Sequence, residues 1–387
     1  MNESFSKIVQ ALDPSSENYG PELVNQILSH AVAARATDIH IVPSSTVTSL
    51  SYRIDGVLQK IAGFDPEVGQ RLVARVKVLS GLLTYRNDQP QEGRIRTGRL
   101  ADSSDVRVAT FPTLFGEKAA IRLFGDSGSL KELADLGLPE DVAENLKNLV
   151  QHTSGVILLT GPSGSGKTTT VYACLRQMIQ DHGASRSLMS LEDPIEMIVP
   201  GVTQSQTKPE SKFDLASGLK AMLRQDPDVI MVGEIRDPET AENAFQAALT
   251  GHLVLTTFHA GSASEAVTRL LDMGLEPYLL SSTLRAVVCQ RLLRKKCTAC
   301  GGETAFGDSE SCKLCSGLKY QGRMVTAEVM DFADSKMSVL LKDAMDADER
   351  QDKAQSLGMQ TLQDRCQTAV EVGQTDELEV FRVMGRR

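Results

Sequence analysis

The chain has 387 residues, of which 41% are hydrophobic, and a formal net charge of −9 at pH 7. This length can supply about two or three domains with ordinary cores, and the acidic balance argues against a protein-wide surface for nucleic acid. No apolar run approaches the ~18 residues that would suggest a membrane span, and residues 1–14 lack the basic and apolar regions of a signal peptide. We therefore expect a globular cytoplasmic protein that binds no nucleic acid and has no membrane span.

The first part of the chain predicts a small domain of mixed helices and strands. Apolar residues recur at helical spacing in two segments and alternate with polar residues in others. The expected elements are, in order, a helix over 21–36, strands at 39–42, 50–54 and 57–58, a helix over 66–79, and strands at 106–108 and 119–123. Asp55-Gly56 is a strong hairpin signal between two of these strands. Because glycine, serine and charged residues dominate 125–137, we place an N-terminal α+β domain at 1–124 and a linker at 125–137.

The rest of the chain, 138–387, predicts a larger domain in which helical and apolar strand-like segments alternate, as in a parallel sheet covered by helices. At its first clear strand-to-helix crossing, the run Gly161 to Thr168 fills every fixed position of the phosphate-binding loop G-x-x-x-x-G-K-[ST]. The glycines let the backbone aim several N–H groups at phosphate oxygens, and the following helix adds its positive end. Lys167 is expected at the outer phosphates and Thr168 at Mg²⁺. The residues expected to bind a nucleoside triphosphate here are Gly161, Ser163, Gly164, Ser165, Gly166, Lys167, Thr168 and Thr169.

Two acidic clusters follow the phosphate loop. The first contains Glu192, Asp193 and Glu196, whose carboxylates could hold Mg²⁺ through water or orient an attacking water. In the second, an apolar strand ends just before Glu234, and ligands of open α/β sheets bind at that edge. Each cluster taken alone is equally compatible with a solvated turn. Their position after the phosphate loop favours a role at the nucleotide.

Histidines and arginines give further candidates. His252 and His259 flank a third apolar strand, although a lone histidine is more often structural. Arg107 and Arg122 lie in segments of the first domain where apolar and polar residues alternate as in a strand. A surface ion pair is the default interpretation of such an arginine.

Four of the seven cysteines form two C-x-x-C pairs, Cys297 with Cys300 and Cys312 with Cys315. Two such pairs can place four thiolates tetrahedrally around Zn²⁺, and the segment between them has almost no apolar residues that would order it without a metal. Four thiolates leave no open position, so the zinc would be structural. The alternative is unrelated thiols or a redox pair, and a redox C-x-x-C would be expected in a thioredoxin-like unit. This cysteine usage agrees with a reducing compartment.

Four blocks of the second domain resemble, in order, the Walker A, Asp box, Walker B and His box motifs of the secretion-superfamily ATPases. The blocks are Gly161 to Thr168, Glu192 to Glu196, Leu223 to Asp237 and Thr250 to His259. Further segments that look like the family are Ala36 to Ile41, Tyr52 to Gly56, Gly116 to Lys118 and Gly322 to Met330. The similarity therefore covers nearly the whole chain. It is closest to the pilus-assembly and type II secretion branch, which carries a paired C-x-x-C motif between its His box and its C-terminal helices.

The resemblance implies a RecA-like P-loop motor domain preceded by a PAS-like α+β domain. The residue pattern adds a zinc-knuckle insertion at 297–315 and a mainly helical, highly charged C-terminal region at 324–387. In the family such subunits form a homo-hexamer with ATP bound between the two domains. The resemblance implies that Glu196 is the catalytic glutamate and that Glu234 acts through the Mg²⁺ shell. Glu192 and Asp193 would contact the nucleotide, and His252 and His259 would sense its state. Arg107 and Arg122 would be arginine fingers.

The resemblance further implies a cytoplasmic ATPase that binds ATP, Mg²⁺ and Zn²⁺ and powers assembly of a type IV pilus or a type II secretion pseudopilus. It would reach the inner membrane through platform and adaptor proteins. A pilus-retraction or DNA-transfer ATPase is the nearest enzyme alternative, and the zinc motif argues against both. A nucleotide-gated scaffold with little turnover is the other alternative, and the intact Glu196, Glu234, Arg107 and Arg122 argue against it.

Two features depart from the family pattern. About twenty residues precede the PAS-like region, whereas pilus-assembly and type II secretion ATPases usually have a further N-terminal domain that docks onto membrane-bound partners. The His box ends Phe258-His259-Ala260-Gly261, where the family more often has Leu-His-Thr-Asn. Because both histidines remain, we expect this second change to tune the site without abolishing it.

Overall fold

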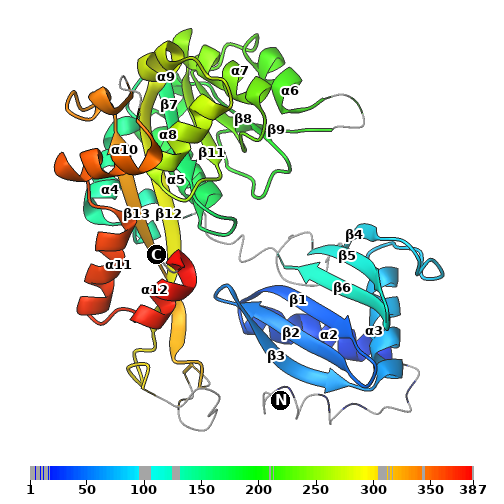
Figure 1. Cartoon of the computed structure of the whole chain (residues 1–387). Coiled ribbons are helices and arrows are strands. Elements are labelled where there is room, and N and C mark those ends of the chain that lie inside the picture. Colours follow the sequence, from blue (N-terminus) through cyan, green and yellow to red (C-terminus); the bar gives the residue numbers. More distant parts are fainter. Residues whose placement is uncertain are drawn as a thin grey trace. The chain divides into compact units, whose positions relative to one another are not determined.

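The computed structural model describes residues 18–95, 106–123, 131–208, 213–303, 317–341 and 345–385, with the single residues 5, 9, 12, 16, 211, 312, 314 and 315. Contacts group the chain into two compact units, formed mainly by residues 1–129 and 130–387 (Figure 1). Each unit has its own sheet and its own hydrophobic core. None of the described helices is both long and apolar enough to cross a lipid bilayer.

The first unit is built on a six-stranded antiparallel sheet in the order β3-β2-β1-β6-β5-β4. Its elements are helices α2 (Tyr19–Ala33) and α3 (Pro66–Leu79) and strands β1 (Ala36–Pro43), β2 (Thr48–Ile54), β3 (Val57–Phe64), β4 (Gln91–Ile95), β5 (Val106–Thr113) and β6 (Gly116–Arg122). Both helices pack on the sheet and on each other. Asp55 and Gly56 have positive φ angles of 48° and 81°, which form the turn between β2 and β3 that the Asp-Gly pair predicts.

The second unit contains a seven-stranded sheet in the order β13-β12-β7-β11-β10-β8-β9, in which every neighbouring pair is parallel except β12 with β13. Its strands are β7 (Gly155–Thr160), β8 (Leu188–Glu192), β9 (Thr203–Gln206), β10 (Val229–Val232), β11 (Leu253–Phe258), β12 (Leu284–Lys296) and β13 (Tyr320–Asp331). Its α-helices are α4 (Glu140–Leu149), α5 (Lys167–His182), α6 (Leu215–Met222), α7 (Pro238–Leu249), α8 (Ala263–Asp272), α9 (Pro277–Thr283), α10 (Ala347–Ser356), α11 (Leu362–Glu371) and α12 (Glu377–Met384).

Neighbouring residues of β7 belong to different core clusters. Val156 and Leu158 pack in one cluster, and Ile157 and Leu159 pack in the other. Both faces of this sheet are therefore covered, which explains why its central strands are continuously apolar in the sequence.

The C-terminal region differs from the expectation of a mainly helical segment at 324–387. Residues 324–331 belong to β13, which pairs with β12, and the α-helices of this region begin only at Ala347. β-Branched residues such as Val325 and Val329 favour a strand, but a short apolar run does not separate helix from strand by spacing alone. Part of the expected linker, 125–130, lies outside the described residues, while Leu133–Leu136 forms a 3₁₀ helix.

Candidate nucleotide-binding site and cysteine cluster

The parallel strands of the second unit end at one common edge of its sheet. β7 and β11 are in register up to Thr160 and Phe258, and β8 and β10 are in register up to Leu191 and Val232. The loops that follow these strands therefore start side by side. They carry the phosphate loop, the segment after Glu192, Glu234 and His259. This is the edge at which open α/β sheets bind ligands.

The phosphate loop joins β7 to helix α5. Gly161, Gly164 and Gly166 have φ angles of 140°, 76° and 94°, a region that side-chain-bearing residues rarely adopt. A side chain at Gly161 would also clash, because its Cβ would lie 2.5 Å from the Gln290 carbonyl oxygen and 2.7 Å from Ser165 Oγ. The loop thus leads directly into the N-terminus of a 16-residue helix, where free N–H groups and the helix dipole favour a bound anion.

Lys167, the first residue of α5, folds back over the phosphate loop. Its Nζ donates to the carbonyl oxygens of Gly161 at 2.8 Å and Pro162 at 3.1 Å. Burial lowers the pKa of Lys167, and the Glu234 and Glu196 carboxylates oppose that shift. The other residues expected at the nucleotide, apart from the buried Ser165, are exposed or half-buried on the loop and the first helical turn: Ser163, Gly164, Gly166, Thr168 and Thr169.

His259 connects the phosphate loop to Glu234. Its Nδ1 lies 3.1 Å from the Gly161 carbonyl oxygen, and its Nε2 lies 2.5 Å from Glu234 Oε1. Both partner atoms are acceptors, so the ring donates to both only when it carries two protons. Arg236 Nε donates to Glu234 Oε2 at 2.7 Å, and Arg236 Nη1 lies 3.7 Å from Asp193 Oδ2. These contacts bring together residues from four separate sequence motifs.

The three carboxylates of the first acidic cluster occupy different environments. Glu192 ends β8, is only 2% exposed, and accepts hydrogen bonds from three uncharged side chains. Asp193 and Glu196 are exposed on the loop that follows. Only an accessible carboxylate can meet a nucleotide or its attacking water without rearrangement, so the structure favours Asp193 and Glu196 for these tasks.

The structure does not bring His252 to the phosphate loop. His252 precedes β11 and His259 follows it, so the two lie at opposite edges of the sheet, ~20 Å apart for a strand of this length. His252 Nδ1 instead lies 2.9 Å from the Ala247 carbonyl oxygen, and its own carbonyl accepts from the Gly155 N–H at 3.1 Å. Within this unit His252 therefore has the contacts of a structural histidine.

Arg107 and Arg122 lie in the first unit, directly opposite each other on β5 and β6. The Arg122 side chain is 64% exposed, and its Nε lies 3.1 Å from Asp38 Oδ1, as in the surface ion pair expected by default. Arg94 stands opposite Arg107, and Asp38 stands opposite Arg122. This row across the sheet concentrates positive charge, which favours an anionic partner.

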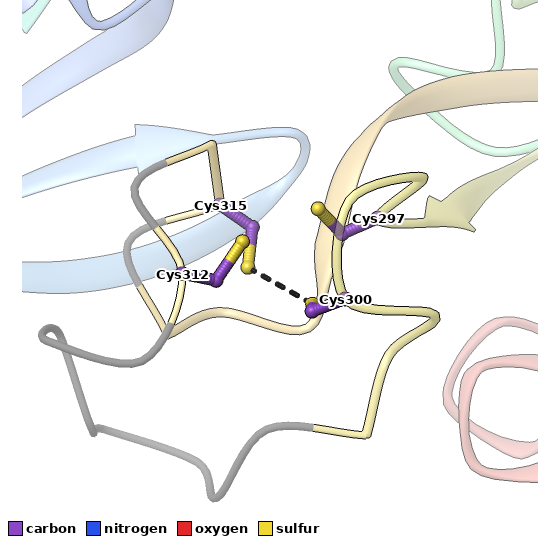
Figure 2. Close-up of side chains that lie close together, drawn as sticks. All are labelled: Cys297, Cys300, Cys312 and Cys315. Carbon is purple, nitrogen blue, oxygen red and sulfur yellow. Dashed lines mark hydrogen bonds between the residues drawn. The ribbon is translucent and has the colours of Figure 1, made fainter.

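The cysteines of the two C-x-x-C pairs form a cluster in the segment that connects the end of β12, at Lys296, to the start of β13, at Tyr320 (Figure 2). Their sulfur atoms all lie within 4.8 Å of one another, and Cys300 Sγ lies 3.7 Å from Cys315 Sγ. Four sulfurs bound at ~2.3 Å to a tetrahedral Zn²⁺ would lie ~3.8 Å apart, so the donor set and its spacing fit zinc. A disulfide would need an S–S distance of ~2.05 Å, and these four cysteines form none with one another.

A family model described as type II/IV secretion system protein matches residues 15–382. The chain belongs to this family. It is 42% identical over 308 residues to the type II secretion system ATPase E of Vibrio cholerae, which covers 79% of this chain and 60% of that protein. It is 36% identical over 368 residues to the type IV pilus assembly ATPase PilB of Thermus thermophilus, which covers 90% of this chain and 41% of that protein. The chain thus spans less than two thirds of the length of either relative.

The fold is similar to that of the Legionella pneumophila ATPase DotB, with a TM-score of 0.70 at 21% identity over 95% of this chain and 96% of that one. This likeness confirms the fold class predicted from the sequence.

Sequence patterns missed several polar residues that contact the motifs of this secretion-family chain, among them Arg236, Tyr172 and Gln204. Arg236 bridges Glu234 and Asp193, while Tyr172 and Gln204 bond Glu192. Arg236 could have been predicted from the sequence, since it follows the Walker B strand by only a few residues. For Tyr172 the sequence gives weaker evidence: it lies four residues after Thr168, and helical spacing places both on one side of α5. No sequence feature connects Gln204 to the motifs, since it lies on a separate strand.

Proposed function

We propose that this chain is an Mg²⁺-dependent ATPase that works as a homo-hexamer and powers assembly of a type II secretion pseudopilus or a type IV pilus. The contacts that run from Lys167 through Gly161 and His259 to Glu234 carry this proposal. They join a phosphate-binding lysine to a carboxylate at one sheet edge, as the chemistry of P-loop enzymes requires. The relatives named as a secretion ATPase and a pilus assembly ATPase support the same class.

The residues at the sheet edge suit the parts needed for phosphoryl transfer to water. Loop N–H groups and Lys167 would hold the β- and γ-phosphates of ATP. Thr168, and Glu234 through water, would hold Mg²⁺, which supplies positive charge to the transferring group. Glu196 is exposed at the same edge and would orient the attacking water and accept its proton.

We infer that Arg107 and Arg122 act on the γ-phosphoryl group when domains and neighbouring subunits close around it. Their position on one charged face of the sheet supports this role, because cationic side chains stabilise the charge that develops during transfer. The motor would act from the cytoplasmic side, and platform and adaptor proteins would couple it to the inner membrane.

The cysteine cluster would hold one structural Zn²⁺ in the segment that connects β12 to β13. It also favours an assembly motor over a retraction or DNA-transfer motor, since the paired C-x-x-C motif is typical of the assembly and type II secretion branch.

Glu196→Gln tests the proposed ATPase activity. The amide keeps the size of the side chain but cannot accept the proton of water, so turnover should fall on the order of 10²-fold or more, while the Kd for ATP changes less than ~twofold. Phosphate release and nucleotide binding should be measured with and without Mg²⁺. Glu377→Gln, at an exposed position on α12, is the matched control and should keep the wild-type rate.

One result would contradict this function, and another would contradict only the role of Glu196. A wild-type chain that binds ATP but releases no phosphate would instead be a nucleotide-gated scaffold. Wild-type turnover in Glu196→Gln would move the catalytic role to another carboxylate, foremost Glu234.

A further inference from the structure

Glu192 is a buried carboxylate that is held by uncharged donors. Ser190 Oγ donates to Glu192 Oε1 at 2.6 Å, Gln204 Nε2 donates to the same oxygen at 3.0 Å, and the Tyr172 hydroxyl donates to Oε2. We call these four residues the Glu192 network. A buried carboxylate is costly unless donors satisfy it, so each of these hydrogen bonds helps to decide where Glu192 sits.

The Glu192 network fastens the loop that carries Glu196. Tyr172 Oη accepts from the N–H of Glu196 at 3.4 Å while it donates to the buried carboxylate. Beyond Glu196, Gln204 Nε2 also donates to the Met197 carbonyl oxygen at 3.0 Å, and Gln204 Oε1 accepts from the Val199 N–H at 2.7 Å. The loop is therefore bonded before, at and after Glu196, whose side chain remains exposed.

Tyr172 links this loop to the helix that starts at the phosphate loop. It lies on α5, one turn beyond Thr168, and is only 3% exposed. Burial, with a further contribution from Glu192, raises the pKa of Tyr172 above its usual value, so the hydroxyl keeps the proton that it donates. The same hydroxyl thus contacts a buried anchor and the backbone of the expected catalytic residue.

We propose that Tyr172 is a positioning residue for ATP hydrolysis, which holds Glu196 in place relative to the nucleotide through the Glu192 network. Glu192 is then a positioning residue as well, although the family motif groups it with the nucleotide contacts. This proposal rests on the proposed function, because it assumes that Glu196 orients the attacking water. A displacement of ~1 Å at a catalytic group can lower turnover ~10²-fold, whereas the contacts of Lys167 with the phosphate loop do not involve Tyr172.

Tyr172→Phe removes one hydroxyl and keeps the ring in its buried site. We expect kcat to fall about tenfold or more, with KM for MgATP and the Kd for ATP changed less than ~twofold. The double variant Tyr172→Phe with Glu192→Gln should show a smaller fold-loss of kcat than the product of the fold-losses in the two single variants, because both residues act through one network.

Tyr320→Phe is the matched control. The Tyr320 hydroxyl also bonds a carboxylate, that of Asp376, at 2.8 Å in the same unit. Tyr320 lies opposite Lys296, the last residue of β12. The end of β7, where the phosphate loop begins, lies beside Cys289, near the middle of β12. Tyr320 is therefore remote from the phosphate loop. Tyr320→Phe should therefore lower the melting temperature about as much as Tyr172→Phe does and keep the wild-type kcat.

Hydrogen exchange gives a readout that does not depend on hydrolysis. Amides in 193–199 should exchange faster in Tyr172→Phe than in the wild type and unchanged in Tyr320→Phe. Unchanged exchange in this segment, a wild-type kcat in Tyr172→Phe, or an equal loss of kcat in Tyr320→Phe would each overturn the inference. A wild type without ATPase activity would refute the proposed function, whereas an active wild type with a fully active Tyr172→Phe would refute this inference alone.

Discussion

Replacing His259 by alanine probes the contacts between the phosphate loop and Glu234. In a ring that carries both protons, the change removes two hydrogen bonds, from Nε2 to Glu234 Oε1 at 2.5 Å and from Nδ1 to the Gly161 carbonyl oxygen at 3.1 Å. A hydrogen bond that involves a charged group contributes ~1.5–3 kcal/mol. The His259 side chain is 48% exposed, so solvent screening reduces each contribution to ~1 kcal/mol.

The two losses amount to ~2 kcal/mol, which corresponds to a ~30-fold drop in kcat/KM if both bonds persist in the transition state. Glu234 keeps its bond to Arg236 at 2.7 Å, so we expect weakened and not abolished activity. Steady-state phosphate release over a range of MgATP concentrations separates kcat from KM.

His182→Ala is the control for this experiment, because His182 is a half-buried histidine at the other end of α5, with its Nε2 2.9 Å from Gln151 Oε1. The kcat/KM of His182→Ala should stay within ~twofold of the wild-type value. A His259→Ala variant with a kcat/KM within ~twofold of the wild type, or an equal loss of kcat/KM in His182→Ala, would contradict a role of His259 at the phosphate loop.

Purified protein should contain one Zn²⁺ per chain, and elemental analysis that finds none under reducing, chelator-free conditions would contradict the cysteine site. Arg107→Ala and Arg122→Ala should each lower turnover ~10³-fold or more, with little change in melting temperature for the exposed Arg122. Mixed rings of an arginine variant and Lys167→Ala should recover part of the activity if a neighbouring subunit supplies the arginine. Normal ATPase activity in both arginine variants would exclude the arginine-finger role, and a loss of activity together with the hexamer would indicate a structural one.

Features that depend on a few adjacent residues were predictable from the sequence. The Asp55-Gly56 turn forms because both residues adopt positive φ, and the phosphate loop forms because its glycines do the same. The two C-x-x-C pairs likewise indicated a four-thiolate cluster, which the sulfur positions match. The family resemblance, carried by several such blocks, is confirmed by the match over residues 15–382.

Predictions that depended on the environment of a longer segment were less reliable. Residues 324–331 form a strand where we expected helix, because pairing with β12 selects the strand that Val325 and Val329 favour, while the spacing of a short apolar run does not separate helix from strand. His252 and His259 look equivalent in the sequence as the two flanks of one strand. Strand direction within the sheet puts one at the nucleotide edge and the other at the opposite edge.

The alternation of helices and strands, the phosphate loop and the cysteine pairs were predictable from the sequence, because each depends on the spacing of residues that are close along the chain; the family resemblance added the RecA-like and PAS-like assignments. Which carboxylate of the first acidic cluster is buried and which is exposed depends on the tertiary structure. Glu192 is buried because Tyr172 from α5 and Gln204 from β9 converge on it, and Glu196 is exposed on the loop that they hold. Contacts between separate elements set this difference, and no local pattern encodes it.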